Sequence, residues 1–320
     1  MKLLITGATG FIGGRILEIA SQYNHQAIAA VRSVPCTESL FNNSTIRFLD
    51  LQQLDKKDDW SELFSDIDVV IHCAAQVQQM QKKTGSETNF YHQINTLATL
   101  DLANHAMKYG VKRFIFLSSI KVNGESSCTN MPFTETIVSV PEDPYAKSKY
   151  AAEQGLLKLA QISNMEVVII RPPLVYGGGV KANFSSMVKI VSLPLPLPLG
   201  SIYNKRSFIY IDNLVDFIFH CCVHPVAANQ VFLISDDHDL STTVLVQELA
   251  KAMDKKVYLM PISEKNLHFI AKCLGKQSIS ERLCGNLQLN ITKAKKTLNW
   301  TPKYTIFQGF KQTVKGFKKI

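Results

Sequence analysis

The sequence predicts an α/β protein with a doubly wound parallel sheet and a smaller C-terminal α/β lobe. An apolar strand at residues 2–6 leads directly into a glycine-rich turn, and a helical pattern follows that turn. Further apolar, strand-like runs alternate with helical patterns through the first half of the chain, which is typical of a parallel sheet covered by helices. The composition shifts beyond residue 176, and we expect the second lobe there.

The glycine-rich turn follows the first strand without a break, as Gly7-Ala8-Thr9-Gly10-Phe11-Ile12-Gly13. Gly7 permits a tight turn, Gly10 lets the backbone approach a pyrophosphate, and Gly13 allows the next helix to pack closely on the strand. The amino end of that helix also attracts phosphate charge. We therefore expect a dinucleotide to bind Gly7, Thr9, Gly10, Phe11, Ile12 and Gly13.

Apolar runs predict further strands at 27–31, 46–49, 68–72 and 113–117, and a helix at 95–103. The second of the five strands ends in Arg32, where an NAD site usually has an acid on the ribose 2′-hydroxyl. Arg32 suits the 2′-phosphate of NADP, so NADP(H) is the favoured cofactor and NAD(H) the alternative; Arg32 could also be a plain surface residue. The small side chains of Ala74 and Ala75 allow a dinucleotide to lie against a strand end.

A helix that opens at Pro144 carries the candidate catalytic pair. Tyr145 and Lys149 are four residues apart, so they share one helix face. An ammonium next to a phenol favours the phenolate and lowers its pKa, and such a phenol can exchange a proton with an alcohol or a carbonyl. Ser119 ends the strand at 113–117, where ligands of parallel sheets bind, although serines in turns are also common.

The second half contains an amphipathic helix at 243–253 and a strand at 256–259. Residues 193–200 alternate Leu with Pro, which cannot donate to a strand ladder, so we expect an extended loop or edge segment. The predicted division is a dinucleotide-binding Rossmann domain over 1–176, including the Tyr145 helix. Residues 177–320 then form mainly a substrate lobe, with some segments returning to the sheet.

Composition narrows the function classes. The 320 residues have a formal charge of +9, but the basic residues are dispersed and no aromatic–basic RNA motif is present, so we expect no nucleic-acid partner. The positive charge could then reflect a solvated basic face, attraction to an anionic membrane surface or an anionic substrate. No apolar run reaches membrane-spanning length. Seven cysteines without CxxC spacing argue against disulfides and a metal site, and we expect a cytoplasmic location, with Cys221 and Cys222 buried.

Several motifs in order make the chain similar to the extended short-chain dehydrogenase/reductase superfamily, in its nucleotide-sugar epimerase/dehydratase/reductase branch. The resemblance covers essentially the whole chain. It is carried by the glycine turn, Asp50-Leu51, residues 72–75, Ser118-Ser119, Pro144–Lys149, Arg171–Gly177, Arg206–Asn213 and Leu298–Pro302.

The resemblance implies a role for each matching residue. Tyr145 would be the acid/base, Lys149 its tuner and a nicotinamide-ribose ligand, and Ser119 the hydroxyl that binds the reacting oxygen. Pro172 and Val175 would line the nicotinamide side, Asp50 and Leu51 the adenine side, and Asn183, Arg206 and, less securely, Arg282 the diphosphate of the sugar nucleotide. A UDP-sugar substrate and a homodimer formed through a helical face are also implied.

The reaction depends on where the chain departs from the family pattern. Asn123 and Pro173 replace a usual Tyr and Asn, which can reshape the sugar pocket, and Ile120-Lys121 after Ser119 argues against a dehydratase. Arg32 favours net reduction, so the expected function resembles that of reductases acting on a UDP-4-keto-6-deoxy-N-acetylhexosamine for surface polysaccharide synthesis. A UDP-glucose or UDP-N-acetylglucosamine 4-epimerase with bound NAD is the alternative. A non-catalytic dinucleotide-sensing, RNA-binding or assembly protein is a third possibility.

Overall fold

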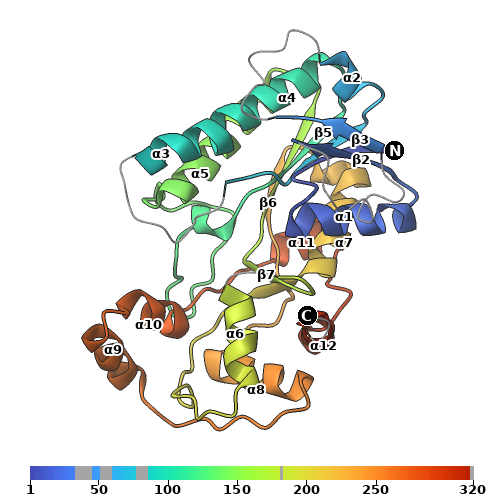
Figure 1. Ribbon diagram of the computed structural model, residues 1–320. Coiled ribbons are helices and arrows are strands. Elements are labelled where there is room, and N and C mark those ends of the chain that lie inside the picture. Colours follow the sequence, from blue (N-terminus) through green and yellow to red (C-terminus); the bar gives the residue numbers. More distant parts are fainter. Residues whose placement is uncertain (33–44, 51–59, 77–85, 181–182, 318–320) are drawn as a thin grey trace.

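The computed structural model describes residues 1–32, 45–50, 60–76, 86–180 and 183–317. Within these residues a seven-stranded parallel sheet forms the centre of the molecule (Figure 1). Its order is β3 (Thr45–Phe48), β2 (Gln26–Val31), β1 (Lys2–Thr6), β4 (Val69–His72), β5 (Arg113–Leu117), β6 (Glu166–Arg171) and β9 (Gln230–Leu233). The chain moves outward in opposite directions from β1 and β4. This is the doubly wound α/β sheet that the sequence predicts.

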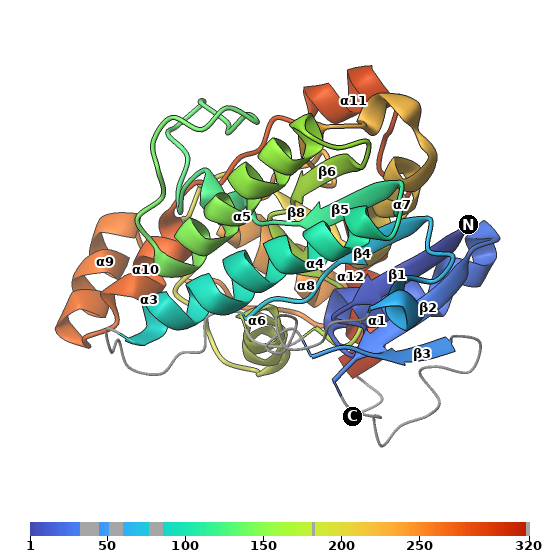
Figure 2. The same ribbon diagram turned by 90° about the horizontal axis from the view of Figure 1, so that it is seen from above.

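Helices cover both faces of this sheet (Figures 1 and 2). One face carries α4 (Ala98–Lys108) and α5 (Pro144–Gln161), with α3 (Ser86–Tyr91) beyond them; the other carries α1 (Phe11–Ala20), α7 (Ile211–Val223) and α11 (Thr292–Leu298). Side chains alternate along each strand, so Leu4 joins the core under α4 and α5, whereas Leu3 and Ile5 join the core under α1 and α7. Both faces are therefore apolar, as parallel strands require.

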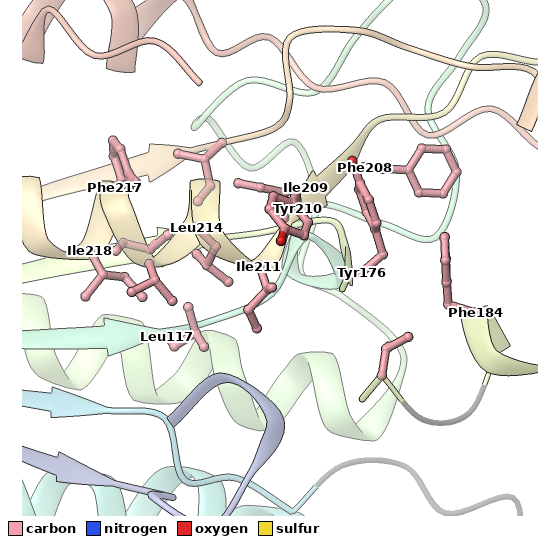
Figure 3. Close-up of a cluster of buried hydrophobic side chains, with 14 of the residues drawn as sticks. Leu117, Tyr176, Phe184, Phe208, Ile209, Tyr210, Ile211, Leu214, Phe217 and Ile218 are labelled. Atoms are coloured by element: carbon pink, nitrogen blue, oxygen red, sulfur yellow. The ribbon is translucent and has the colours of Figure 1, made fainter. Parts of the chain in front are cut away.

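The second of these cores continues into the C-terminal part of the chain (Figure 3). A short parallel pair, β7 (Leu174–Tyr176) and β8 (Phe208–Tyr210), leads away from the main sheet. Tyr176 stacks on Phe184 and packs on Phe310, with ring centroids 5.2 and 4.9 Å apart. The surrounding helices are α6 (Asn183–Ser192), α8 (Thr242–Ala252), α9 (Glu264–Cys273), α10 (Gln277–Cys284) and α12 (Ile306–Phe317). One continuous core therefore joins the sheet to the lobe, and the domain boundary at residue 176 stays a prediction.

A buried carboxylate fixes this junction. Asp236 accepts hydrogen bonds from the Tyr176 hydroxyl at 2.7 Å, from Asn213 Nδ2 at 2.8 Å and from the backbone N–H of Tyr210. Burial raises the pKa of Asp236, while these donors lower it. The group ties β7, β8 and the first turn of α7 together, because all three donate to one carboxyl group.

The five strands predicted in the first half of the chain agree with the observed ones to within a residue or two at each end. The helix predicted at 243–253 is α8, whose N-cap Ser241 accepts a hydrogen bond from Val244 N. Cys221 and Cys222 are buried as predicted. The strand predicted at 256–259 is wrong: a single bridge joins Leu259 to Leu197. The Pro residues on either side of Leu197 lack the N–H groups that would extend a ladder. Over the described residues, none of the helices is long and apolar enough to cross a membrane.

A buried ion pair fastens α5 to the sheet. Glu153 and Arg171 are 0% and 3% exposed, and Arg171 donates through Nη2 and Nε to the two carboxylate oxygens at 2.6 and 2.9 Å. The Ser118 hydroxyl also donates to Glu153, and Arg171 Nη1 donates to Asn123 Oδ1 and to the Glu135 carbonyl. One pair thus connects the helix, the ends of β5 and β6, and the loop that follows Ser119.

Removing one charge from this pair should destabilise the fold strongly. We expect Glu153→Gln to lower the free energy of unfolding by about 3 kcal/mol, because Arg171 would remain buried without a counter-charge. Urea denaturation followed by circular dichroism measures the loss. The matched control is Lys112→Met, which breaks the exposed Lys112–Asp68 pair and should cost less than about 1 kcal/mol. Equal losses for the two variants would contradict the assignment.

Candidate active site

The predicted site residues lie along one edge of the sheet, because all its strands are parallel. Gly7 follows β1, Arg32 follows β2, Asp50 follows β3, Ala74 and Ala75 follow β4, Ser119 follows β5, and Pro172 follows β6. This is the carboxyl edge, and the strand order reverses between β1 and β4, where ligands of doubly wound sheets bind. Leu51 lies outside the described residues, as does the side chain of Asn183 at the start of α6.

The glycine turn is shaped for a close approach of backbone. Gly7 has φ +67°, and a Cβ there would lie 2.7 Å from the Ala74 nitrogen. A Cβ on Gly13 would lie 2.3 Å from the Gly7 carbonyl oxygen, so only glycine lets α1 begin this close to β1. Thr9 and Gly10 are exposed at the amino end of α1. The turn therefore fits a phosphate group, which would meet an open backbone and the positive end of the helix dipole.

A neutral histidine joins β1 to β4 beneath this turn. Thr99 Oγ1 donates to the Asn95 carbonyl, so it accepts from His72 Nε2 at 3.0 Å. His72 Nδ1 then accepts from Thr6 Oγ1 at 2.7 Å, and Thr6 accepts in turn from the Ala74 N–H. Complete burial lowers the pKa of His72 to about 3. The network fixes one tautomer and holds the Ala74 backbone beside the glycine turn.

Asn95 extends this network to α5. It lies in a π-helical turn, His92–Leu97, between α3 and α4, so the helix predicted at 95–103 begins in this turn and continues as α4. Asn95 Oδ1 accepts from Gln76 N at 2.8 Å, and its Nδ2 donates to the Gln76 carbonyl and to Ser148 Oγ, each at 3.1 Å. The widened turn places one side chain between the loop after β4 and α5, and such turns recur at functional sites.

Tyr145 stands in the first turn of α5. Asp143 caps the helix by accepting from Ala146 N at 2.9 Å, and Pro144 occupies the first helical position. Burial, and after it the Asp143 carboxylate, raise the pKa of Tyr145 to about 12, although a hydrogen bond with Ser119 acts to lower it. The structure brings Tyr145 and Ser119 together, and the phenol carries its proton at neutral pH.

Lys149 is buried one turn further along α5, with 2% of its surface exposed. Its Nζ donates to the Leu117 carbonyl at 3.0 Å and lies 4.5 Å from the centroid of the Phe116 ring. Burial lowers the pKa of Lys149 to about 8. The expectation that Lys149 lowers the pKa of Tyr145 is wrong for the chain by itself, because burial dominates the phenol and the ammonium is directed at β5.

The two arginines predicted to bind a diphosphate meet at the carboxyl end of α10. Arg206 Nη1 donates to the backbone carbonyls of Arg282 and Gly285, each at 2.9 Å. Burial lowers the pKa of Arg206. Arg282 is exposed and its Nε donates to the Ser278 carbonyl. Arg206 thus has a structural role in holding the end of α10, whatever else its remaining N–H groups bind.

The two departures from the family pattern have different surroundings. Asn123 accepts from Arg171 and donates through Nδ2 to the Thr134 carbonyl at 2.7 Å. Its side chain therefore holds the loop over 123–135. Pro173 is buried directly after Pro172, whose carbonyl accepts from Ile120 N at 3.0 Å. Both residues secure backbone near the site.

A cavity of about 820 Å³ lies elsewhere, at the amino ends of β4, β5 and β6. Its charged lining residues are used in ion pairs, Lys112 with Asp68 and Arg113 with Glu166. It is at the opposite edge of the sheet from Tyr145, so it has no part in the site.

Sequence reasoning gave no role to several residues that shape the site, although His72, Ser148 and Arg171 lie in the motifs that carry the family resemblance. These residues are Thr6, His72, Tyr91, Asn95, Ser148, Glu153 and Arg171; Tyr91 packs edge-on against Tyr145 with centroids 6.2 Å apart. A signal was present for two of them. Arg171 follows four consecutive apolar residues at 167–170, and Glu153 follows two alanines on α5. Charged residues in apolar surroundings usually have a buried partner.

Comparisons with known proteins give the family. The model of the NAD dependent epimerase/dehydratase family matches residues 3–235. A UDP-glucose 4-epimerase from Vibrio cholerae is 44% identical, over 99% of this chain and 95% of that protein. The N-acetyl-alpha-D-glucosaminyl-diphospho-ditrans,octacis-undecaprenol 4-epimerase of Escherichia coli O157:H7 is 26% identical over 98% of this chain and 94% of its own length.

The fold is also similar to that of a solved epimerase structure. A UDP-glucose 4-epimerase crystal structure from Thermotoga maritima superposes with a TM-score of 0.77, covering 100% of this chain and 99% of that one at 23% identity. The family match covers most of the chain, and the motifs at the glycine turn, Ser119, Tyr145 and Lys149 fall within it. The chain therefore belongs to the NAD dependent epimerase/dehydratase family.

Proposed function

We propose that this protein is a UDP-hexose 4-epimerase, most closely a UDP-glucose 4-epimerase, with a tightly held dinucleotide. The observation that carries the proposal is the 44% identity to the Vibrio cholerae epimerase over almost the whole of both chains. The sequence alone favoured a 4-ketosugar reductase on the strength of Arg32. The relationship supports the epimerase alternative better.

The carboxyl edge of the sheet is suited to a dinucleotide cofactor. The glycine turn and the first turn of α1 would hold its pyrophosphate, Arg32 and Asp50 would lie toward the adenosine, and Pro172 and Val175 toward the nicotinamide. When bound, the cofactor supplies reversible hydride transfer at a sugar carbon. In an epimerase the hydride returns to the same carbon, so the overall reaction involves no net redox change.

The chain's own side chains would handle the proton. Tyr145 would receive the proton of the sugar 4-hydroxyl as C4 is oxidised. It would return the proton to the same oxygen after the keto sugar has rotated in the site to present its other face. Ser119, which already hydrogen-bonds Tyr145, would donate to the same oxygen. Lys149 would supply the positive charge that stabilises the phenolate, and the neutral His72 would leave that ammonium as the cation beside the loop after β4.

The sugar nucleotide would be held from the lobe. Arg206 and Arg282, brought together at the end of α10, can provide guanidinium groups for a diphosphate, with Asn183 at the start of α6. A diphosphate is common to nucleotide sugars and to the lipid-linked substrate in the name of the Escherichia coli relative. The diphosphate contacts alone therefore do not select between these substrates, and the close identity to the UDP-glucose enzyme favours UDP.

A 4-ketosugar reductase remains the second candidate, because Arg32 is exposed at the end of β2, where a 2′-phosphate would lie.

Two assays distinguish the epimerase from the reductase. We expect the purified protein to interconvert UDP-glucose and UDP-galactose without added cofactor, as followed by proton NMR, and to release NAD on denaturation, as identified by mass spectrometry. Stoichiometric loss of NADPH absorbance with a UDP-4-keto-6-deoxy-hexosamine, without epimerisation, would instead establish the reductase.

Tyr145 is tested by removing its hydroxyl. Tyr145→Phe should lower kcat by about 10²–10⁴-fold, the usual contribution of a general acid/base, while the released dinucleotide stays unchanged. Tyr150→Phe, five residues further along the same helix, is the control and should leave kcat unchanged. If Tyr145→Phe retained full activity, another group would have to move the proton.

Lys149 links activity to pH-dependent stability. Its pKa is about 8 in the folded chain against 10.5 unfolded, so the folded state binds fewer protons between these values and wild-type stability rises with pH there. Relative to Lys149→Met, wild type should gain about 2 kcal/mol of unfolding free energy between pH 7 and pH 10, measured by urea denaturation. A pH-independent difference would show that the ammonium is not desolvated. The variant should also lose epimerisation.

A further inference from the structure

Helix α9 exposes an apolar face to solvent. Phe269 is 69% exposed, Leu274 is 66% exposed and Ile270 is 43% exposed. Ile270 and Leu274 are four residues apart and lie side by side. Phe269 precedes Ile270, so three exposed apolar side chains gather at the carboxyl end of α9, where Leu274 is the C-cap. Surface helices normally turn their apolar side to the core, but α9 buries Leu267 and leaves these three apolar side chains in solvent.

The opposite side of α9 makes its contacts with the protein. Leu267 is buried, and His268 Nδ1 is 2.9 Å from the hydroxyl of Ser280, which is itself buried on α10. These contacts fix the rotation of α9, so the exposure of Phe269 and Leu274 follows from the packing. In both views α9 lies at the periphery of the molecule, beyond α10 (Figures 1 and 2).

Lysines lie along α9 and in the segments on either side of it. Residues 255–276 contain five lysines, at 255, 256, 265, 272 and 276, and one acid, Glu264. All five lysines are exposed, and in the described part of the chain none of them forms a salt bridge. Lys265 and Lys272 flank Phe269 on the helix surface. Tyr258 and Met260, in the segment that leads into α9, are exposed as well.

We propose that the α9 face, defined as Lys265, Phe269, Ile270, Lys272, Leu274 and Lys276, binds the surface of an anionic lipid bilayer. Apolar side chains on one helix face with lysines beside them suit the boundary between headgroups and acyl chains. The excess of positive charge complements anionic headgroups and adds attraction for each lysine near the surface. A second copy of this chain is a poorer partner, because it would bring like-charged lysine clusters together.

This surface is separate from the proposed chemistry. None of its residues is among those assigned to the cofactor, the proton or the diphosphate, so the inference does not depend on which sugar the enzyme uses. Binding through the α9 face would place the protein at a membrane and leave the site at the carboxyl edge of the sheet free for the reaction.

Sedimentation of the full-length protein with vesicles tests the proposal. We expect binding to vesicles of equal parts phosphatidylglycerol and phosphatidylcholine, little binding to phosphatidylcholine alone, and weakening as salt is raised. The double variant Phe269→Ser/Leu274→Ser should bind about tenfold more weakly, and Lys265→Glu/Lys272→Glu should do the same. Both should keep wild-type sugar-nucleotide activity and thermal stability.

Ile162→Ser is the matched control, since Ile162 is 81% exposed at the end of α5, away from α9, and it should bind like wild type. Equal binding by the control and by both double variants would overturn the proposal, as would an absence of binding to anionic vesicles. Light scattering supplies the remaining outcome. If Phe269→Ser/Leu274→Ser dissociated an oligomer, the α9 face would be an interface between copies and the lipid assignment would be wrong.

Discussion

The geometry of the site depends on the buried pair Glu153–Arg171. Three elements that carry predicted site residues meet at this pair: α5, whose first two turns hold Tyr145 and Lys149, and the carboxyl ends of β5 and β6, which Ser119 and Pro172 follow. Replacing such a pair by apolar residues can preserve stability, but it would remove the directional bonds that set the helix against the strands. The pair is therefore best understood as a device for alignment, and its cost is offset by the bonds Arg171 makes to Asn123 and Glu135.

A second constraint is electrostatic. The space under α5 contains His72 and Lys149, and two buried cations there would repel each other strongly. The hydroxyl network of Thr6 and Thr99 stabilises the neutral imidazole, and its pKa of about 3 keeps it uncharged. Lys149 remains the cation, with the Leu117 carbonyl and the Phe116 ring as partners. Burial raises the pKa of Tyr145 to about 12, so in the proposed reaction Lys149 would have to stabilise the phenolate against this cost of burial.

Much of the sheet could be predicted from the sequence, because apolar strands and a glycine turn are local signals. The pairing of Tyr145 with Ser119 was predicted through the family resemblance, because no local signal connects residues 26 apart in the sequence. The absence of a strand at 256–259 could not be predicted from that segment alone. Residue 259 forms only one bridge, because its partner Leu197 lies between prolines in a distant segment. The π-helical turn at Asn95 depends on bonds to Gln76 and Ser148, and the pKa of Tyr145 depends on burial. These properties arise only when distant segments pack together.

The substitutions at 123 and 173 show how motif and structure combine. In the sequence they suggest a remodelled sugar pocket, because they replace residues usual in the family. In the structure, Asn123 is committed to Arg171 and the Thr134 carbonyl, so its first role is to attach the loop that follows Ser119 to the same buried pair that aligns α5. A residue bound on both sides of its amide has little freedom to contact a sugar. Substrate selection would then fall to the lobe beyond Tyr176, where Arg206 both fixes the end of α10 and lies beside Arg282.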